Sequence, residues 1–147
     1  MNISFEARLP IEDCLFLLGE TFTPDELYSR VVIFQYAKKL SEKAFFLIVD
    51  DNGARQGFIA YYLNEELSFI FITRIAVNEL FRHQGLGRKM IEALSNHYSN
   101  RFEAIELEVE KTNIIAKNFY LNLGFKTKED RETKLLMRKE LNGSNHR

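Results

Sequence analysis

A glycine-rich turn between two hydrophobic periodicities constrains the fold of this chain more than any other feature. The segment LSFIFITRIAV (67–77) is an apolar run of strand length. After FRHQGLGRKM (81–90), hydrophobic residues recur at three- and four-residue spacing, which predicts a helix with one apolar face. His97 falls on this face and is expected to be packed there. AIELEV (104–109) then alternates as a strand does. A strand, helix and strand in this order predict two adjacent parallel strands joined by a crossover.

Other helices and strands are expected on both sides of this crossover. They are strands at 3–7, 44–50, 57–63, 124–128 and 134–141, and helices at 10–18, 23–40 and 113–123. Gly19 is expected to end the first helix and Gly124 the last. The three strands between 44 and 77, with turns between them, are typical of an antiparallel meander. Together these elements predict a mixed sheet with helices on its faces.

Composition narrows the class of protein. The chain has 147 residues and is 46% hydrophobic, which suits one folded domain. A net charge of -1 gives no general attraction for nucleic acid, so any anion site must be local. Cys14 is the single cysteine, which excludes an internal disulfide and a cysteine-based metal cluster. No signal peptide or bilayer-spanning run is evident, so a cytoplasmic protein without membrane contact is expected.

The turn before the central helix has two interpretations. A helix start carries unpaired N–H groups and partial positive charge, and glycines let the backbone approach a bulky anion. Arg82, Arg88 and Lys89 add full charges, which favours a pyrophosphate cradle. A tight turn with a solvated basic flank explains the pattern R-x-x-G-x-G equally well. The motifs of triphosphate P-loops and of dinucleotide-binding folds are incomplete or absent.

Two motifs together resemble the GNAT superfamily of N-acetyltransferases. Its pattern R/Q-x-x-G-x-G/A is met by Arg82, Gly85 and Gly87. LEVEKTNIIAKNFYLNLGF (107–125) resembles the family's L-x-V-x-x-x-N-x-x-A-x-x-x-Y-x-x-x-G-F. The order of elements also matches over nearly the whole chain.

This resemblance implies an α/β (α+β) fold. The expected GNAT-like sheet is mixed and mostly antiparallel, with about seven strands flanked by about four helices. A splayed pair of parallel strands would hold the coenzyme. Residues 1–141 are expected to form a single domain, and residues 142–147 a disordered tail.

The resemblance further implies that acetyl-CoA is the cosubstrate. The pyrophosphate would bind backbone groups of Arg82, His83, Gln84, Gly85, Leu86, Gly87 and Arg88. The pantetheine arm would pair with Ile75, Ala76 and Val77, and the Ile75 amide would also donate to the thioester carbonyl. Asn113 would lie beside this arm, although a helix cap alone explains an asparagine there. Lys117 and Lys89 could meet the 3′-phosphate or could be ordinary exposed lysines.

Tyr120 is the strongest candidate for a catalytic residue. It stands where the family places a tyrosine beside the coenzyme sulfur. A phenol of ordinary pKa ~10 can give a proton to the departing thiolate. Without the motif, Tyr120 is better explained as a core aromatic on the helix face that it shares with Phe119 and Leu123.

Glu108 is the candidate general base. The branch of the superfamily that acetylates the N-termini of ribosomal proteins has a glutamate in this L-E-V setting. A carboxylate there could take the amine proton directly or through water. The alternative is that Glu106, Glu108 and Glu110 form a solvated sheet face. Phe71 stands where another branch of the family has its base, and it cannot accept a proton.

The leading hypothesis is therefore an acetyl-CoA-dependent N-acetyltransferase that acts by direct attack of a primary amine. The acceptor would be a small molecule, or a protein N-terminus or lysine. The alternative is a non-catalytic acyl-CoA-binding module that acts as a sensor or complex subunit. No metal and no nucleic acid are expected, and a homodimer is plausible for this family.

The segment 12–40 is expected to wall the acceptor site. Its carboxylates would attract a cationic amine, although Asp25 and Glu26 are better explained as acids that favour a helix start. Its aromatic residues could shape an apolar pocket or fill the core. They are Phe16, Phe22, Tyr28, Phe34 and Tyr36.

Overall fold

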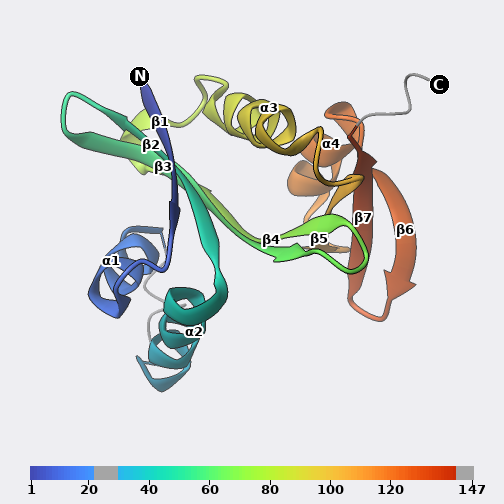
Figure 1. The fold of residues 1–147 in the computed structure, drawn as a ribbon. Helices are drawn as coiled ribbons and strands as arrows, with labels where there is room; N and C mark the ends of the chain where they lie inside the picture. Colours follow the sequence, from blue (N-terminus) through green and yellow to red (C-terminus); the bar gives the residue numbers. More distant parts are fainter. Residues whose placement is uncertain (22–29, 142–147) are drawn as a thin grey trace. The chain divides into compact units, whose positions relative to one another are not determined.

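The computed structural model describes residues 1–21 and 30–141, and it describes side chains in these ranges except at residues 20, 21, 30 and 31. The described residues form seven strands and four α-helices (Figure 1). The elements in chain order are β1 (Asn2–Ala7), α1 (Ile11–Thr21), α2 (Arg30–Lys43), β2 (Phe45–Asp51), β3 (Ala54–Asn64), β4 (Phe69–Val77), η2 (Glu79–Phe81), α3 (Leu86–Tyr98), β5 (Ala104–Glu110), α4 (Ile114–Asn122), β6 (Lys126–Arg131) and β7 (Lys134–Glu140). The sheet order is β1-β2-β3-β4-β5-β7-β6. β4 and β5 pair in parallel, which confirms the mixed, mostly antiparallel architecture and the crossover.

The chain divides into two compact units. The first consists of Met1–Tyr62 and Arg74–Met90, and the second of Leu63–Thr73 and the chain from Ile91 onward. The elements β3, β4 and α3 each begin in one unit and end in the other. The single domain expected over residues 1–141 stays a prediction, and the expected tail at 142–147 lies outside the described residues.

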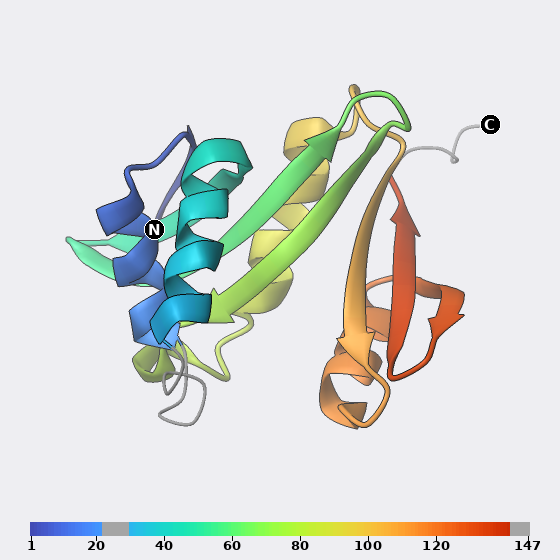
Figure 2. The ribbon, with the colours of Figure 1, turned by 90° about the horizontal axis from the view of Figure 1, so that it is seen from below.

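The first unit packs two helices against antiparallel strands. β1 pairs with β2, and β2 with β3, which places Leu47 opposite Ile59. Figure 2 shows α1 and α2 side by side against these strands. Their common core includes Cys14, Leu17, Leu18, Phe46 and Phe58, all buried. Ala76, near the end of β4, also packs against this core.

The strands β2 and β3 are joined by the expected tight turn. Asn52 and Gly53 both have positive φ, 50° and 82°, as a two-residue hairpin turn of type I′ requires. Farther along β3, Gly57 lies close to the end of β4. A Cβ built on Gly57 would be 2.8 Å from the carbonyl oxygen of Ala76 and 3.3 Å from Sδ of Met90. Only glycine permits this approach without a shift of the neighbouring backbone.

Two helix boundaries differ from the expected ones. Gly19 does not end α1, which continues to Thr21, because this exposed glycine keeps a negative φ and is tolerated within the helix. α2 continues past Leu40 to Lys43. The helix start expected at Thr23 lies outside the described residues.

The second unit contains the parallel pair and the C-terminal hairpin. The registers of β4 and β5 run from Phe69 opposite Ala104 to Phe71 opposite Glu106, and β5 then runs on to Glu110. A short ladder of this kind suits the expected splay. β5 pairs with β7, and β7 with β6, both antiparallel.

The apolar face of α3 needs one correction. His97 was expected to pack on that face, but it is exposed near the helix end. Tyr98 is the buried residue there, and its ring meets that of His97 edge to face with centroids 4.7 Å apart. The larger and less polar ring of Tyr98 is buried in place of the imidazole of His97.

Candidate functional site

A short 3-10 helix connects β4 to the glycine-rich turn in the first unit. Asn78 caps this helix, η2, because its Oδ1 accepts a hydrogen bond from the Leu80 N–H at 3.0 Å. The Phe81 N–H donates to the Asn78 carbonyl at 2.8 Å. The Asn78 N–H donates to the carbonyl of Gln56 at 2.8 Å, which ties the end of β4 to β3. Sequence analysis missed this element, although an asparagine directly after a strand is a recognisable cap.

Arg82 and Gly85 shape the turn in different ways. The Nε of Arg82 donates to the carbonyl of Val77 at 3.0 Å, so this side chain braces the turn against the strand end. Gly85 has a φ of 77°, and a Cβ there would meet nothing within 4 Å. The backbone conformation, and not lack of space, therefore requires the glycine. His83 is exposed and also adopts a positive φ, 65°, which is uncommon for a residue with a side chain.

The start of α3 presents backbone donors beside cationic side chains. The Lys89 N–H donates to the Gly85 carbonyl at 3.1 Å, which closes the first turn of the helix. N–H groups earlier than this one point out of the helix end and carry its partial positive charge. Buried Leu86 and Met90 anchor the helix, while Arg88 is exposed. The first unit thus brings together the predicted residues from Ile75 to Arg88 in a form that suits an anion.

The second predicted motif lies in the second unit, where Asn113 caps α4. Its Oδ1 accepts a hydrogen bond from the Ala116 N–H at 3.1 Å, and its carbonyl accepts from the Lys117 N–H at 3.0 Å. Asn113 itself is exposed, and Lys117 is half-buried. The capping role of Asn113 is therefore present, with its surface open to a ligand.

Tyr120 is buried on α4 among aromatic rings. Its ring meets Phe119 and Phe125 at oblique angles, with centroids 5.1 Å and 5.5 Å apart. The Phe125 N–H donates to the carbonyl of Tyr120 at 3.0 Å, which closes the end of the helix. Burial raises the pKa of Tyr120 to about 12. The phenol therefore keeps its proton at neutral pH, and this is the form that can act as an acid.

Glu106 is the buried member of the three glutamates on β5. Its Oε2 accepts hydrogen bonds from Lys128 Nζ at 2.7 Å and from Arg138 Nη1 at 2.8 Å. Burial alone would raise the pKa of Glu106, but these two hydrogen bonds hold it below its ordinary value. Glu106 is thus an ionised structural residue. Sequence analysis did not separate it from Glu108, because its partners lie on distant strands.

Glu108 lies on the same face of β5 and is also ion-paired. Arg131 Nη1 is 2.7 Å from its Oε2, Lys134 Nζ is 4.0 Å from its Oε1, and its side chain is 28% exposed. Hydrogen bonds to Glu129 and Glu108 raise the pKa of Arg131. This face of β5 therefore carries a row of ion pairs. An amine that gives its proton to Glu108 would have to compete with Arg131 for the carboxylate.

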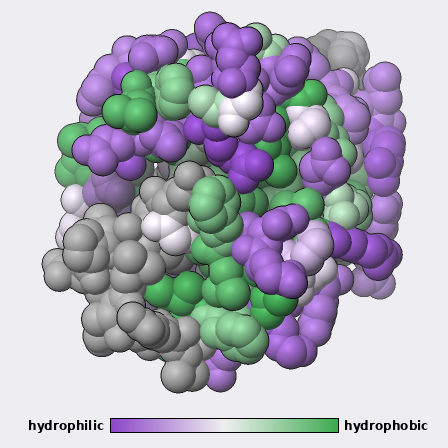
Figure 3. Space-filling model, turned by 90° about the vertical axis from the view of Figure 1, so that its left-hand side faces the viewer, coloured by the Kyte–Doolittle hydropathy of each residue, from purple (hydrophilic) through white to green (hydrophobic). Residues whose placement is uncertain are grey.

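The expected acceptor wall is described only in part. Glu12 and Asp13 are exposed in the first turn of α1. Phe16 and Phe34 are exposed on α1 and α2, whereas Tyr36 packs against the core. Figure 3 views the side of these helices and shows hydrophobic surface, in green, in its lower half. Phe22 and Tyr28 lie outside the described residues.

Comparison with known proteins shows the family to which the chain belongs and solved structures with a similar fold. The Acetyltransferase (GNAT) family matches residues 11–125. None of the curated proteins matches the sequence. Among solved structures, the chain is similar to PaiA N-acetyltransferase from Thermoplasma acidophilum in complex with coenzyme A, with a TM-score of 0.70 and 20% identity over 95% of this chain and 99% of that one. It is also similar to the ribosomal-protein-S18-alanine N-acetyltransferase from Escherichia coli, with a TM-score of 0.71 and 20% identity over 99% of both chains.

Within residues 1–21 and 30–141, no helix is both long and apolar enough to cross a membrane. The same ranges contain no group of three or more His, Cys, Asp or Glu side chains that could hold a metal ion.

Proposed function

This chain belongs to the GNAT family of acetyltransferases, and from that premise we propose that it transfers an acetyl group from acetyl-CoA to a primary amine. The acceptor would be a small molecule, or a protein N-terminus or lysine. The observation that carries the proposal is the buried phenol of Tyr120 on α4, at the tyrosine position of the second motif. A cytoplasmic location and a homodimer stay predictions.

The coenzyme would be held mainly by main-chain groups. The backbone from Arg82 to Arg88 would bind the pyrophosphate, which is supported by the positive φ of Gly85 and the helix start at Leu86. Ile75, Ala76 and Val77 would pair with the pantetheine arm, and Asn113 and Lys117 would lie along it. The relative crystallised with coenzyme A supports this choice of ligand.

The proposed reaction is a direct acyl transfer. The neutral amine attacks the thioester carbonyl carbon, and the Ile75 N–H donates to the oxyanion that forms. The carbon–sulfur bond then breaks, the thiolate takes the proton of Tyr120, and the amide remains on the acceptor. Before the attack, the ammonium form of the amine gives one proton to Glu108, directly or through water, because a protonated amine has no lone pair with which to attack. The second proton, which the nitrogen loses as the amide forms, returns to the phenolate of Tyr120, and Glu108 releases its proton to solvent.

Thiol release from acetyl-CoA with a panel of amines tests the role of Tyr120. We expect Tyr120→Phe to lower turnover by about tenfold or more, because the leaving thiolate loses its proton donor. Coenzyme affinity should stay near that of the wild type. Tyr98→Phe is a matched control, because Tyr98 is also buried but lies outside both motifs. Equal turnover in all three proteins would remove Tyr120 from the mechanism.

The cradle is tested by a pair of glycine variants with the same backbone strain. Gly85 and Gly53 both have positive φ and open space at the Cβ position. We expect Gly85→Val to lower coenzyme A affinity by about a hundredfold, because the turn must change its backbone path. Gly53→Val strains the β2–β3 turn instead and should leave the affinity unchanged. Isothermal titration with coenzyme A distinguishes the two variants.

A non-catalytic coenzyme-binding module is the second candidate function. The ion pair between Glu108 and Arg131 favours it, because the Oε2 of Glu108 is already engaged by the guanidinium at 2.7 Å and is less accessible to an amine. If wild type binds coenzyme A and no amine stimulates thiol release, the module replaces the enzyme. If Glu108 is the base, Glu108→Gln must change the pH–rate profile.

A further inference from the structure

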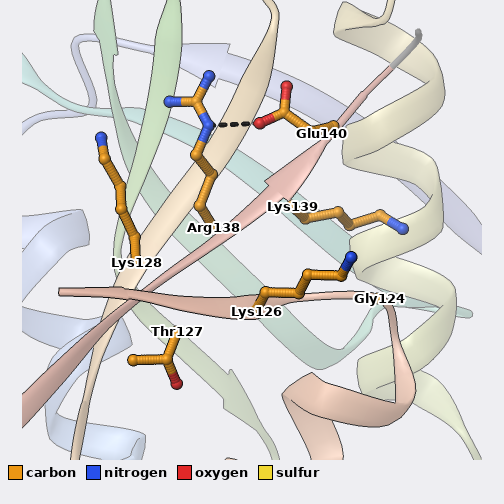
Figure 4. Close-up of a pocket in the computed structure, with 7 residues that line it drawn as sticks. All are labelled: Gly124, Lys126, Thr127, Lys128, Arg138, Lys139 and Glu140. Carbon is orange, nitrogen blue, oxygen red and sulfur yellow. Dashed lines mark hydrogen bonds and ion pairs between the residues drawn. The ribbon is translucent and has the colours of Figure 1, made fainter. Parts of the chain in front are cut away.

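We propose that the second unit carries a separate site for a phosphate group, in a pocket on the β6–β7 hairpin. The cavity has a volume of about 320 Å³, which is within the range of small-ligand sites. It is lined by Gly124, Lys126, Thr127, Lys128, Arg138, Lys139 and Glu140 (Figure 4). None of these residues belongs to the proposed coenzyme or catalytic site, so this inference does not depend on the proposed function.

The pocket concentrates positive charge in a chain that is almost neutral. Four of its lining side chains are cationic and one, Glu140, is anionic, whereas the whole chain has a net charge of -1. Glu106 adds one buried carboxylate beside Lys128 and Arg138. The remaining cations repel one another, and a bound anion would remove this repulsion.

The cationic side chains of the pocket differ in how many of their N–H groups already donate to protein acceptors. Arg138 donates from Nη1 to Glu106 at 2.8 Å and from Nε to Glu140 at 2.6 Å. Lys139 donates to the carbonyl of Leu123 at 2.8 Å, which leaves two of its three N–H groups for a ligand.

Lys126 is the lining cation whose ammonium group is available to a ligand. Its ammonium makes no hydrogen bond or ion pair with any residue that the structure describes. In Figure 4 the side chains of Lys126 and Lys139 both extend toward the Gly124 end of the pocket. A Cβ on Gly124 would be 3.2 Å from Lys139 Nζ, so the glycine leaves room for that ammonium.

Phosphate is the anion that these donors fit best. Carboxylate recognition usually relies on the planar fork of arginine, and two of the three guanidinium nitrogens of Arg138 already donate to carboxylates. The available donors are ammonium groups, which bind phosphate as point charges. The volume exceeds that of a bare phosphate, so the ligand would be a small phosphorylated molecule.

Isothermal titration of the full chain with inorganic phosphate and with glycerol 3-phosphate tests the site. Both probes should bind wild type, and Lys126→Gln should weaken both by about tenfold, because one charge-assisted hydrogen bond is lost. Lys43→Gln, which removes an exposed lysine from α2 in the other unit, should bind as wild type does. Unchanged melting temperatures would show that each variant is folded.

Further arms separate this site from the cradle and from a lipid surface. Lys126→Gln should keep wild-type affinity for coenzyme A, and Gly85→Val should keep the Lys126-dependent binding of glycerol 3-phosphate. The proposal is overturned if wild type binds neither soluble probe, or if Lys126→Gln binds both as well as wild type does. Binding to phosphatidic acid vesicles without binding to either soluble probe would overturn it too.

Discussion

Burial makes Tyr120 hold its proton more firmly than an exposed phenol does, although a phenol of ordinary pKa ~10 is also protonated at neutral pH. The ring lies among Phe119 and Phe125, and the low polarity of this surrounding disfavours the phenolate. The motif alone predicted a tyrosine near the coenzyme sulfur, but it could not show how firmly the phenol holds its proton. The surroundings of the ring supply that information, and they also have a consequence for stability.

Tyr120→Phe is expected to make the fold less sensitive to alkali. The folded pKa of Tyr120, about 12, exceeds the unfolded value of about 10, so its contribution is complete below pH ~10 and is lost as pH rises toward 12. Wild type should therefore lose about 1 kcal/mol more than the variant between about pH 9 and pH 11. Urea unfolding at both pH values measures this difference. Parallel losses in the two proteins would contradict the perturbed pKa.

Two glycines should respond to alanine in opposite directions. Gly57→Ala would place a Cβ 2.8 Å from the Ala76 carbonyl oxygen, and we expect a loss of about 1–3 kcal/mol in the free energy of unfolding. Gly19→Ala meets nothing within 4 Å on an exposed helix position and should gain about 0.5–1 kcal/mol. Denaturant unfolding of the two variants beside wild type gives both signs. A Gly57→Ala protein as stable as wild type would show that β4 can move away.

At the level of elements, β5 packs into the core with one face and forms ion pairs with the other. Leu107 and Val109 are buried, while Glu106, Glu108 and Glu110 form ion pairs with β6 and β7. Alternation in the sequence predicted both faces of the strand. It could not predict which carboxylate is buried, because the cations that decide this are twenty or more residues away in the chain.

Glu106→Gln is expected to destabilise the second unit in a pH-dependent way. The folded pKa of Glu106 is depressed, so the ion pairs stabilise the fold above the unfolded pKa and the stabilisation is lost as pH falls through the folded pKa. We expect a loss of about 1–3 kcal/mol at neutral pH that shrinks in acid. Unfolding curves near pH ~7 and pH ~3 measure it. A loss of the same size at both pH values would mean that packing, and not charge, is responsible.

The limits of sequence analysis at this scale have identifiable causes. The crossover, the β2–β3 turn and the cap at Asn113 depend on local periodicity or on single residue types, and all three were predicted. The end of α1 was misplaced because glycine stops a helix only when the next segment turns away. The element η2 was missed because three residues carry no periodicity.

At the scale of the whole molecule, the two units share their secondary structure. The chain leaves the first unit after Tyr62, returns at Arg74 and leaves again after Met90. Neither unit is therefore a continuous segment, and removal of either unit would cut through β3, β4 and α3. This chain path supports the predicted single domain.

Unfolding is accordingly expected to be one cooperative transition. Amide hydrogen exchange measured at increasing urea concentration should show β2 and β5 losing protection at the same midpoint, because the strands that join them belong to both units. Mass spectrometry of peptic fragments from the two strands gives the two midpoints. Two separated midpoints would contradict the single domain and would assign each unit its own stability.

The pairing of Phe71 with Glu106 limits how this protein could be re-engineered. Grafting a carboxylate onto position 71, to supply a second kind of catalytic base, would set two negative charges on neighbouring strands at the end of the parallel ladder. One of them would have to take up a proton, or Glu106 would have to give up Lys128 or Arg138. A successful transplant would therefore have to redesign position 106 together with position 71.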